Sequence, residues 1–135
     1  MARYIGPTCK LARREGVDLM QRVLATFDYH DDGRIVLLHV DRKMLEESGG
    51  EMGDTEGFVN IATSVDGVDL VGFLKEIDDE TWRVSLRVRK EGDVQVVAAK
   101  FGGGGHRMAA GCTLEGPLDE VKELLATELR GALDR

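Results

Sequence analysis

The feature best suited to chemistry is a run of four glycines, Gly102, Gly103, Gly104 and Gly105, followed by His106. Ordering a glycine costs roughly 1 kcal/mol more than ordering an alanine, so such a run indicates a backbone that must approach something closely. Consecutive N–H groups in mixed right- and left-handed conformations form a concave nest that binds anions. We therefore predict an anion site here, flanked by the His106 ring. A mobile surface loop is the alternative.

Two nucleotide-binding glycine motifs do not match this run. The dinucleotide motif GxGxxG needs a further glycine where Arg107 or Met108 stands. A P-loop needs Lys and then Ser or Thr directly after its last glycine, and here His106 and Arg107 follow. Both motifs also lead from a strand into a helix, whereas a helix is expected before these glycines and a strand after them.

A second candidate is the polar face of the strand expected over residues 81–90. Arg83, Ser85, Arg87 and Arg89 alternate with Trp82, Val84, Leu86 and Val88, so the two sets point to opposite faces. Arginine binds phosphate through a planar, bidentate fork. Arg87 or Arg89, facing His106, would therefore clamp a phosphate. A solvated face balanced by acidic residues elsewhere is the alternative.

The charge distribution favours a small anionic ligand or a short strand. The 135 residues include 18 basic and 25 acidic residues, a net charge of −7, which argues against non-specific binding of long duplex DNA. Residues 41–80 carry 12 acidic and 3 basic residues, whereas residues 81–107 carry 6 basic and 2 acidic ones. The basic residues are thus concentrated around the two candidates.

The rest of the composition predicts an ordinary cytoplasmic domain. No apolar run approaches 18 residues and no signal peptide is recognisable, so neither a membrane span nor secretion is expected. Cys9 and Cys112 are far apart in the sequence, which argues against a disulfide framework or a zinc site.

No catalytic residue and no metal ligand is predicted in this chain. His30, Asp31 and Asp32 have metal-ligand side chains, but an Asp-Gly turn is expected at that point. His39 shares a strand face with apolar residues and is expected to be packed and hydrogen-bonded. A two-metal site needs a denser set of carboxylates and histidines than the sequence offers.

The elements that position these residues follow from periodicity and capping. Val17, Met20, Leu24 and Phe27 form a helical stripe, and we expect Asp41, Thr55 and Asp93 to cap helices. The pattern predicts an α/β fold, a single compact domain with a mixed five-stranded sheet flanked by helices. The expected helices cover 17–26, 42–48, 56–64, 93–100 and a segment from 117, and the strands include 34–41, 68–77, 81–90 and 109–114, with a hairpin turn at 31–33.

Three stretches resemble one known family. They are Gly-Gly-Gly-Gly-His-Arg-Met-Ala-Ala-Gly-Cys at 102–112, Asp-Thr-Glu-Gly-Phe-Val-Asn at 54–60 and Val-Ser-Leu-Arg at 84–87. Together they resemble the DHH-associated, substrate-binding C-terminal domain of DHH-family phosphoesterases. Within that family they are most similar to the bacterial oligoribonuclease/pAp phosphatase branch, also labelled exopolyphosphatase-related. The likeness extends over about residues 17–133.

The resemblance implies a division of labour. In the family an N-terminal DHH domain carries two metals, usually manganese, and this chain contains neither Asp-His-His nor Asp-x-Asp. We therefore expect the catalytic half to be absent, residues 1–15 to be an arm or linker remnant, and residues 16–135 to be the substrate-binding domain. The expected ligand contacts are Arg87, Gly102, Gly103, Gly104, Gly105 and His106, with Ser85, Arg89 and Asn60 as weaker candidates.

One departure and three alternative functions accompany this interpretation. The family often has a small polar residue after the strand arginine, and here it is Val88, which leaves the choice between Arg87 and Arg89 open. The expected substrates are short oligoribonucleotides or pAp, and the expected protein partner is the DHH domain, with a homodimer left open. Polyphosphate hydrolysis, a stand-alone RNA-binding module of the alanyl-tRNA synthetase type and a small-anion regulatory domain are the alternatives.

Overall fold

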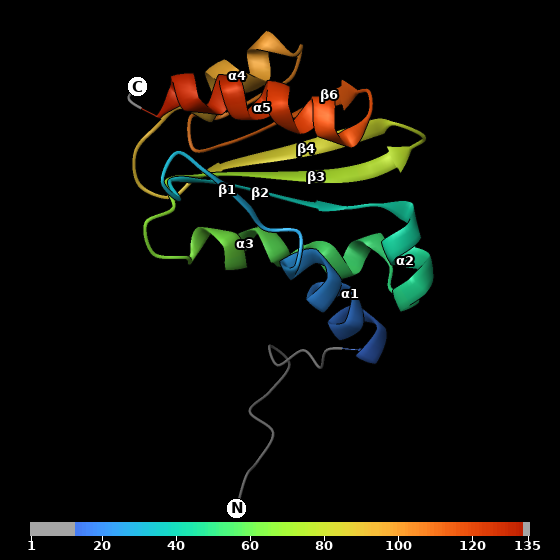
Figure 1. Cartoon of the computed structure of the whole chain (residues 1–135). Helices are drawn as coiled ribbons and strands as arrows, with labels where there is room; N and C mark the ends of the chain where they lie inside the picture. Colours follow the sequence, from blue (N-terminus) through green and yellow to red (C-terminus); the bar gives the residue numbers. More distant parts are fainter. Residues whose placement is uncertain (1–12, 134–135) are drawn as a thin grey trace, which may run out of the picture.

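The computed structural model describes residues 13–133, which form one α/β domain with helices on both faces of a mixed sheet (Figure 1). The sheet has six strands in the order β1-β2-β3-β4-β6-β5. The elements are α1 (Arg14–Leu24), β1 (Asp28–His30), β2 (Ile35–Val40), α2 (Arg42–Ser48), the 3-10 helix η1 (Met52–Thr55), α3 (Phe58–Thr63), β3 (Leu70–Asp78), β4 (Thr81–Val88), α4 (Val94–Lys100), β5 (Gly104–Gly105), β6 (Ala109–Glu115) and α5 (Leu118–Ala132).

The predicted α/β class and flanking helices are confirmed. Five strands were expected and the sixth is β5, which lies within the glycine run. β2 and β3 are parallel, and the other neighbouring strands are antiparallel. A parallel pair needs a crossover, which α2, η1 and α3 provide below the sheet in Figure 1.

The two faces of the sheet are covered to different extents. Helices α4 and α5 cover one face, where Trp82, Val84, Leu86 and Val88 of β4 are buried. The core on the opposite face is built from α1, β2, α3 and β3, and no residue of β4 or β6 belongs to it. On that face the apolar layer therefore ends at β3, and the outward side chains of β4 and β6 remain accessible.

Of the three helix caps predicted from the sequence, two are confirmed and the third is wrong. The Asp41 carboxylate accepts from the Met44 N–H (2.8 Å), and Asp93 accepts from the Gln95 N–H (2.9 Å), as expected. Thr55 does not cap α3. It is buried within η1, where its hydroxyl donates to the Met52 carbonyl (2.6 Å), because a 3-10 turn precedes the helix.

The first helix begins earlier than its apolar stripe indicated. Its buried residues are Leu19 and Val23, whereas Val17 and Leu24 are exposed to 36% and 37%. Met20 and Phe27 are partly buried against the same core, so two of the four stripe residues pack as expected. Residues 1–12, with Cys9 and most of the expected arm, lie outside the described residues. None of the described helices combines the length and apolarity that crossing a membrane requires.

Candidate anion-binding site

Three rows of residues cross β3, β4 and β6 on this face; their β4 and β6 members are uncovered, whereas Val71 and Phe73 of β3 are buried. Residues directly opposite each other in neighbouring strands share a face, so the register defines each row. One row joins Val71, Arg87 and Ala109, the next Phe73, Ser85 and Gly111, and the third Lys75, Arg83 and Thr113. We call this surface the cationic face; it consists of Lys75, Arg83, Ser85, Arg87, Gly104, His106, Ala109, Gly111 and Thr113.

The glycine run first ends helix α4. Gly102 has a φ of 78°, its N–H donates to the Ala99 carbonyl (3.1 Å), and the Gly103 N–H donates to the Ala98 carbonyl (2.8 Å). These two bonds form a Schellman motif, which requires a left-handed residue just beyond the helix and favours glycine there. The N–H groups of Gly102 and Gly103 are thus already used within the chain.

The next glycines lie against β6. Gly104 pairs with Gly111, and Gly105 pairs with Ala110. A Cβ on Gly103 would lie 2.1 Å from the Gly111 carbonyl oxygen, and a Cβ on Gly105 would lie 2.5 Å from the Ala110 Cα. Close approach of two backbones therefore explains both glycines.

The expected nest of consecutive free N–H groups does not form, because most of these groups bond within the chain. His106 and Ala109 exchange both N–H···O bonds (2.7 and 3.2 Å), so the alternation of an antiparallel pair leaves the Gly105 N–H pointing away from β6. β5 is the outermost strand, so this donor lies at the open edge of the sheet.

Gly104 is the exception in the run. Nothing lies within 4 Å of a Cβ built on it, and its φ is not in the left-handed region. It stands opposite Gly111, which pairs with Ser85, so these three residues form a floor with almost no side chains. Such a floor lets a ligand come close to the sheet.

His106 and Arg87 flank a small residue in the row beside this floor. Ala109 pairs with Arg87 on one side and exchanges hydrogen bonds with His106 on the other. The three residues thus share a row and a face, with two strand spacings of roughly 4.8 Å each between the outer backbones. Arg87 is half-buried, donating to the Leu86 carbonyl (3.0 Å), and His106 is exposed. The predicted pair is therefore placed to hold one anion between them.

The cations of this face have no acidic partners. Among residues 13–133, Lys75, Arg83 and Arg87 form no ion pair with a carboxylate within 4.0 Å. Burial lowers the pKa of Lys75 and the charge of Arg87 lowers it further, whereas Glu56 opposes the shift. In a protein with a net charge of −7, uncompensated cations over a small-residue floor indicate a site for an anion.

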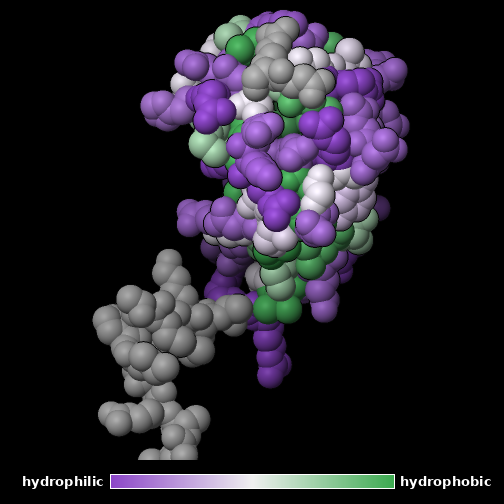
Figure 2. All heavy atoms as spheres, turned by 90° about the vertical axis from the view of Figure 1, so that its left-hand side faces the viewer, coloured by the Kyte–Doolittle hydropathy of each residue, from purple (hydrophilic) through white to green (hydrophobic). Residues whose placement is uncertain are grey.

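Two of the weaker candidates, Arg89 and Asn60, lie apart from this row, whereas Ser85 lies beside it. Arg89 follows the end of β4, beyond the last residue paired with β6, and its N–H donates to the Asp69 carbonyl (2.8 Å). The geometry therefore favours Arg87 over Arg89 as the partner of His106. Asn60 is exposed on α3, and no contact brings its side chain to Arg87. Figure 2 views the end of the molecule where β4 stops, and its surface there is mainly hydrophilic.

The histidines set aside as structural behave in two ways. His30 ends β1, and the turn predicted after it is confirmed by positive φ angles at Asp31, Asp32 and Gly33. His39 packs edge-on against Trp82, with 6.2 Å between ring centroids. Its Nδ1 is buried without a hydrogen-bond partner, so the expectation of a hydrogen-bonded ring is wrong at that atom. Burial lowers the pKa of His39.

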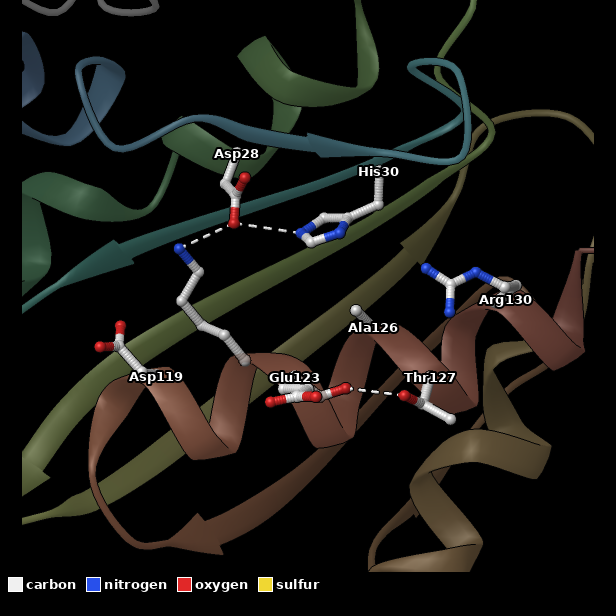
Figure 3. A pocket seen from close by; sticks show the side chains of 8 residues that line it. Asp28, His30, Asp119, Glu123, Ala126, Thr127 and Arg130 are labelled. Carbon is white, nitrogen blue, oxygen red and sulfur yellow. Dashed lines mark hydrogen bonds and ion pairs between the residues drawn. The ribbon is translucent and has the colours of Figure 1, made fainter.

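A cavity of about 300 Å³ lies on the opposite face, between β1 and α5 (Figure 3). Its basic side chains contact aspartates: Asp28 accepts from Lys122 (2.9 Å) and contacts the His30 ring (3.1 Å), and Arg130 binds Asp31 (2.6 Å). Within the described part of the chain, no group of three or more His, Cys, Asp or Glu residues could hold a metal ion. The cationic face is therefore the better candidate site.

Sequence reasoning missed part of this surface. Lys75, Ala109, Gly111 and Thr113 were not selected, although they line the same three rows. The alternation of Ala109, Gly111 and Thr113 with buried Ala110, Cys112 and Leu114 was an available signal, since it places three small residues on one strand face.

Known proteins share both this fold and parts of the sequence. The bifunctional oligoribonuclease and PAP phosphatase NrnA of Thermus thermophilus is 37% identical over 118 residues, covering 87% of this chain and 35% of NrnA. An exopolyphosphatase-related protein of Bacteroides fragilis superposes with a TM-score of 0.80 at 30% identity, covering 90% of this chain and 36% of that one. The chain thus spans about a third of the length of these relatives.

Two further similarities carry less weight. The pGpG-specific phosphodiesterase PggH of Vibrio cholerae has a TM-score of 0.58 at 14% identity, over 87% of this chain and 40% of that one, which shows the fold alone. A 19-residue stretch is 95% identical to small ribosomal subunit protein uS4 of Alkalilimnicola ehrlichii, covering 14% of this chain and 9% of uS4.

The DHHA1 domain model matches residues 32–131, which is most of the sequence, and the chain therefore belongs to the DHHA1 domain family.

Proposed function

We propose that this domain binds the phosphate of short oligoribonucleotides or pAp for a DHH-family phosphoesterase. Arg87, Ala109 and His106 share one row of the sheet, and this arrangement carries the proposal. An arginine fork and an imidazole on either side of a methyl group can hold one phosphate through charge-assisted hydrogen bonds.

The floor beside this row supports the proposal. Ser85, Gly111 and Gly104 leave room for a sugar or base to lie on the sheet. The outward Gly105 N–H adds a donor at the edge of the sheet. The homology to NrnA is consistent with a nucleotide ligand rather than an isolated phosphate ion.

This domain would contribute positioning and charge neutralisation rather than bond cleavage. The metals implied by the family need clustered carboxylates and histidines, and residues 13–133 contain no such cluster. The described residues do not fit a manganese site, so the proposal leaves the cleavage chemistry to a DHH domain. We expect the 135-residue chain with added manganese not to release phosphate from pAp.

Substitution of the two flanking side chains tests the proposed binding. Arg87→Gln and His106→Ala should each weaken the binding of pAp to the chain by about 10- to 100-fold, since a hydrogen bond to a charged group contributes roughly 1.5–3 kcal/mol. Titrations followed by heteronuclear NMR measure such weak binding, with a dissociation constant on the order of 0.1–1 mM expected for the parent chain.

Arg130→Gln is the matched control. It removes one arginine charge on the opposite face and at the opposite edge of the sheet, and it should leave pAp binding unchanged. Unchanged binding of pAp in both Arg87→Gln and His106→Ala would contradict the proposal. Tighter binding of polyphosphate than of pAp would move the substrate class to polyphosphate.

A further inference from the structure

Arg83 extends across β6 toward the glycine floor. Its Nη1 lies 3.4 Å from the Thr113 hydroxyl, and its Nη2 lies 3.2 Å from the position that a Cβ on Gly111 would occupy. The guanidinium therefore lies over the backbone of β6, where it is still exposed to solvent. The absence of a side chain at Gly111 makes this position available.

The Arg83 guanidinium lies near the Arg87–His106 pair, a short distance along β6. Gly111 lies two residues along β6 from Ala109, the residue between Arg87 and His106. Two residues of a strand span about 6.6 Å. This step is comparable to the separation of successive phosphates in an extended single strand.

The charges around Arg83 favour a second anion. Lys75 and Arg83 stand directly opposite each other in the register of β3 and β4, and like charges in such pairs are destabilising. The Lys75 ammonium lies 5.2 Å from the centroid of the Phe73 ring, so it is held at the sheet rather than free to swing away. Neither cation has a carboxylate within 4.0 Å among residues 13–133. A bound phosphate would relieve the repulsion between them.

We propose that Arg83 binds a second phosphate, one nucleotide along from the phosphate held between Arg87 and His106. This inference rests on the proposed function. It implies that the cationic face binds a linear oligonucleotide at two successive phosphates, with Lys75 as a supporting charge.

The test compares two probes on the 135-residue chain: adenosine 5′-phosphate, with one phosphate, and the 5′-phosphorylated diadenylate pApA, with two in succession. Arg83→Gln should weaken pApA binding about 10-fold and adenosine 5′-phosphate binding less than about 2-fold, because only pApA reaches the second position. Arg87→Gln should weaken both probes, and the control Arg130→Gln neither. Arg83 is exposed, so its variant should retain the parent NMR spectrum.

A second readout separates phosphate contact from a general effect of charge. If Arg83 contacts a phosphate, Arg83→Gln should reduce the slope of log affinity against log salt concentration by about 1 for pApA. The slope for adenosine 5′-phosphate should stay unchanged. Arg83→Lys keeps the charge but lacks the planar fork, and it should recover part of the lost pApA affinity.

Each outcome decides between the two proposals. If Arg83→Gln binds pApA as well as the parent chain does, or loses affinity equally for both probes, the second position is refuted. The proposed function then stands, provided that Arg87→Gln still weakens adenosine 5′-phosphate. If the parent chain binds neither probe, both proposals fall.

Discussion

The cationic face and the β1–α5 cavity contain similar residue types but differ in whether their basic side chains form ion pairs. In the cavity, Lys122 and Arg130 are each paired with an aspartate within 2.9 Å. On the cationic face, Lys75, Arg83 and Arg87 have no carboxylate partner among residues 13–133. Paired charges contribute to the fold, whereas unpaired ones are free to bind a ligand. The unpaired cations that an anion site needs therefore lie on the cationic face rather than in the cavity.

Backbone geometry reinforces this difference. The β1–β2 turn binds α5 through the Arg130 side chain, so side chains join the elements around the cavity. At the cationic face, β5 approaches β6 through glycines, so the surface is built mainly from backbone. A surface of this kind can hold a ligand close to the sheet, and its shape depends on individual glycines.

The largest expected effect is therefore at Gly103. Gly103→Ala places a methyl group 2.1 Å from the Gly111 carbonyl oxygen, and backbone cannot yield as a flexible side chain can. We expect a loss of about 3 kcal/mol in the free energy of unfolding, with a melting temperature lower by about 10 °C. Thermal unfolding followed by circular dichroism measures the change.

Gly104→Ala is the matched control, because nothing lies within 4 Å of the added methyl group. Its stability should stay within about 0.5 kcal/mol of that of the parent chain. Its methyl group would stand on the floor beside Gly111, so pAp binding should weaken although the fold is intact. Equal melting temperatures for the Gly103 and Gly104 variants would show that β5 does not approach β6 as described.

These glycines also mark where prediction from sequence stops. Local signals predicted the Asp41 and Asp93 caps and the alternating faces of β4, because each depends on residues close together in the chain. The distinct roles of Gly103 and Gly104 depend on the pairing of β5 with β6, which local sequence does not encode. The run was correctly selected as unusual, but a helix end and a backbone contact explain most of it.

The features of the site also divide into those that the sequence predicts and those that depend on contacts between strands. Arg87 and His106 were selected from residue type and motif, and the sheet places them in one row. The direction of the Arg83 side chain depends on the open space above Gly111, which belongs to another strand. The packing of His39 against Trp82 likewise joins two strands, and its Nδ1 has no hydrogen-bond partner there. Contacts between strands thus determine side-chain directions and hydrogen bonds that the sequence pattern does not predict.

Ligand-induced stabilisation should distinguish the two regions directly. With a dissociation constant of about 0.1–1 mM, 10 mM pAp should raise the free energy of unfolding by about 1.4–2.7 kcal/mol. Arg87→Gln should abolish most of this gain, and Arg130→Gln should keep it. Denaturant unfolding with and without pAp measures the gain, and a loss in the Arg130 variant alone would reverse the assignment of the two regions.

The cavity should reveal its paired charges through pH. Burial raises the pKa of Asp28, but hydrogen bonds and charge from Lys122 and His30 outweigh burial, and the net pKa is lowered. A carboxyl group with a lowered pKa stabilises the fold fully above its unfolded-state pKa, and this contribution disappears as pH falls through the folded-state value. Asp28→Asn should therefore destabilise the chain at pH 7 and lose that difference in acid.

The size of the Asp28 effect should be modest. The side chain is 40% exposed, so solvent screens the interaction and we expect less than about 1 kcal/mol at pH 7. Denaturant unfolding of both proteins across the acidic range gives the comparison. A difference that grows as pH falls would contradict the pairing of Asp28 with Lys122 and His30.

The smallest effect is expected at Lys75. Burial and the Arg87 charge lower the pKa of its ammonium in the free chain, with Glu56 opposing them. A phosphate bound on the cationic face adds negative charge nearby, which favours the protonated amine, so the pKa should rise toward its ordinary value on addition of pApA. NMR titration of the lysine side chains in both states measures the two values. A Lys75 pKa unaffected by saturating pApA would place the ligand away from β3 and restrict the site to Arg87 and His106.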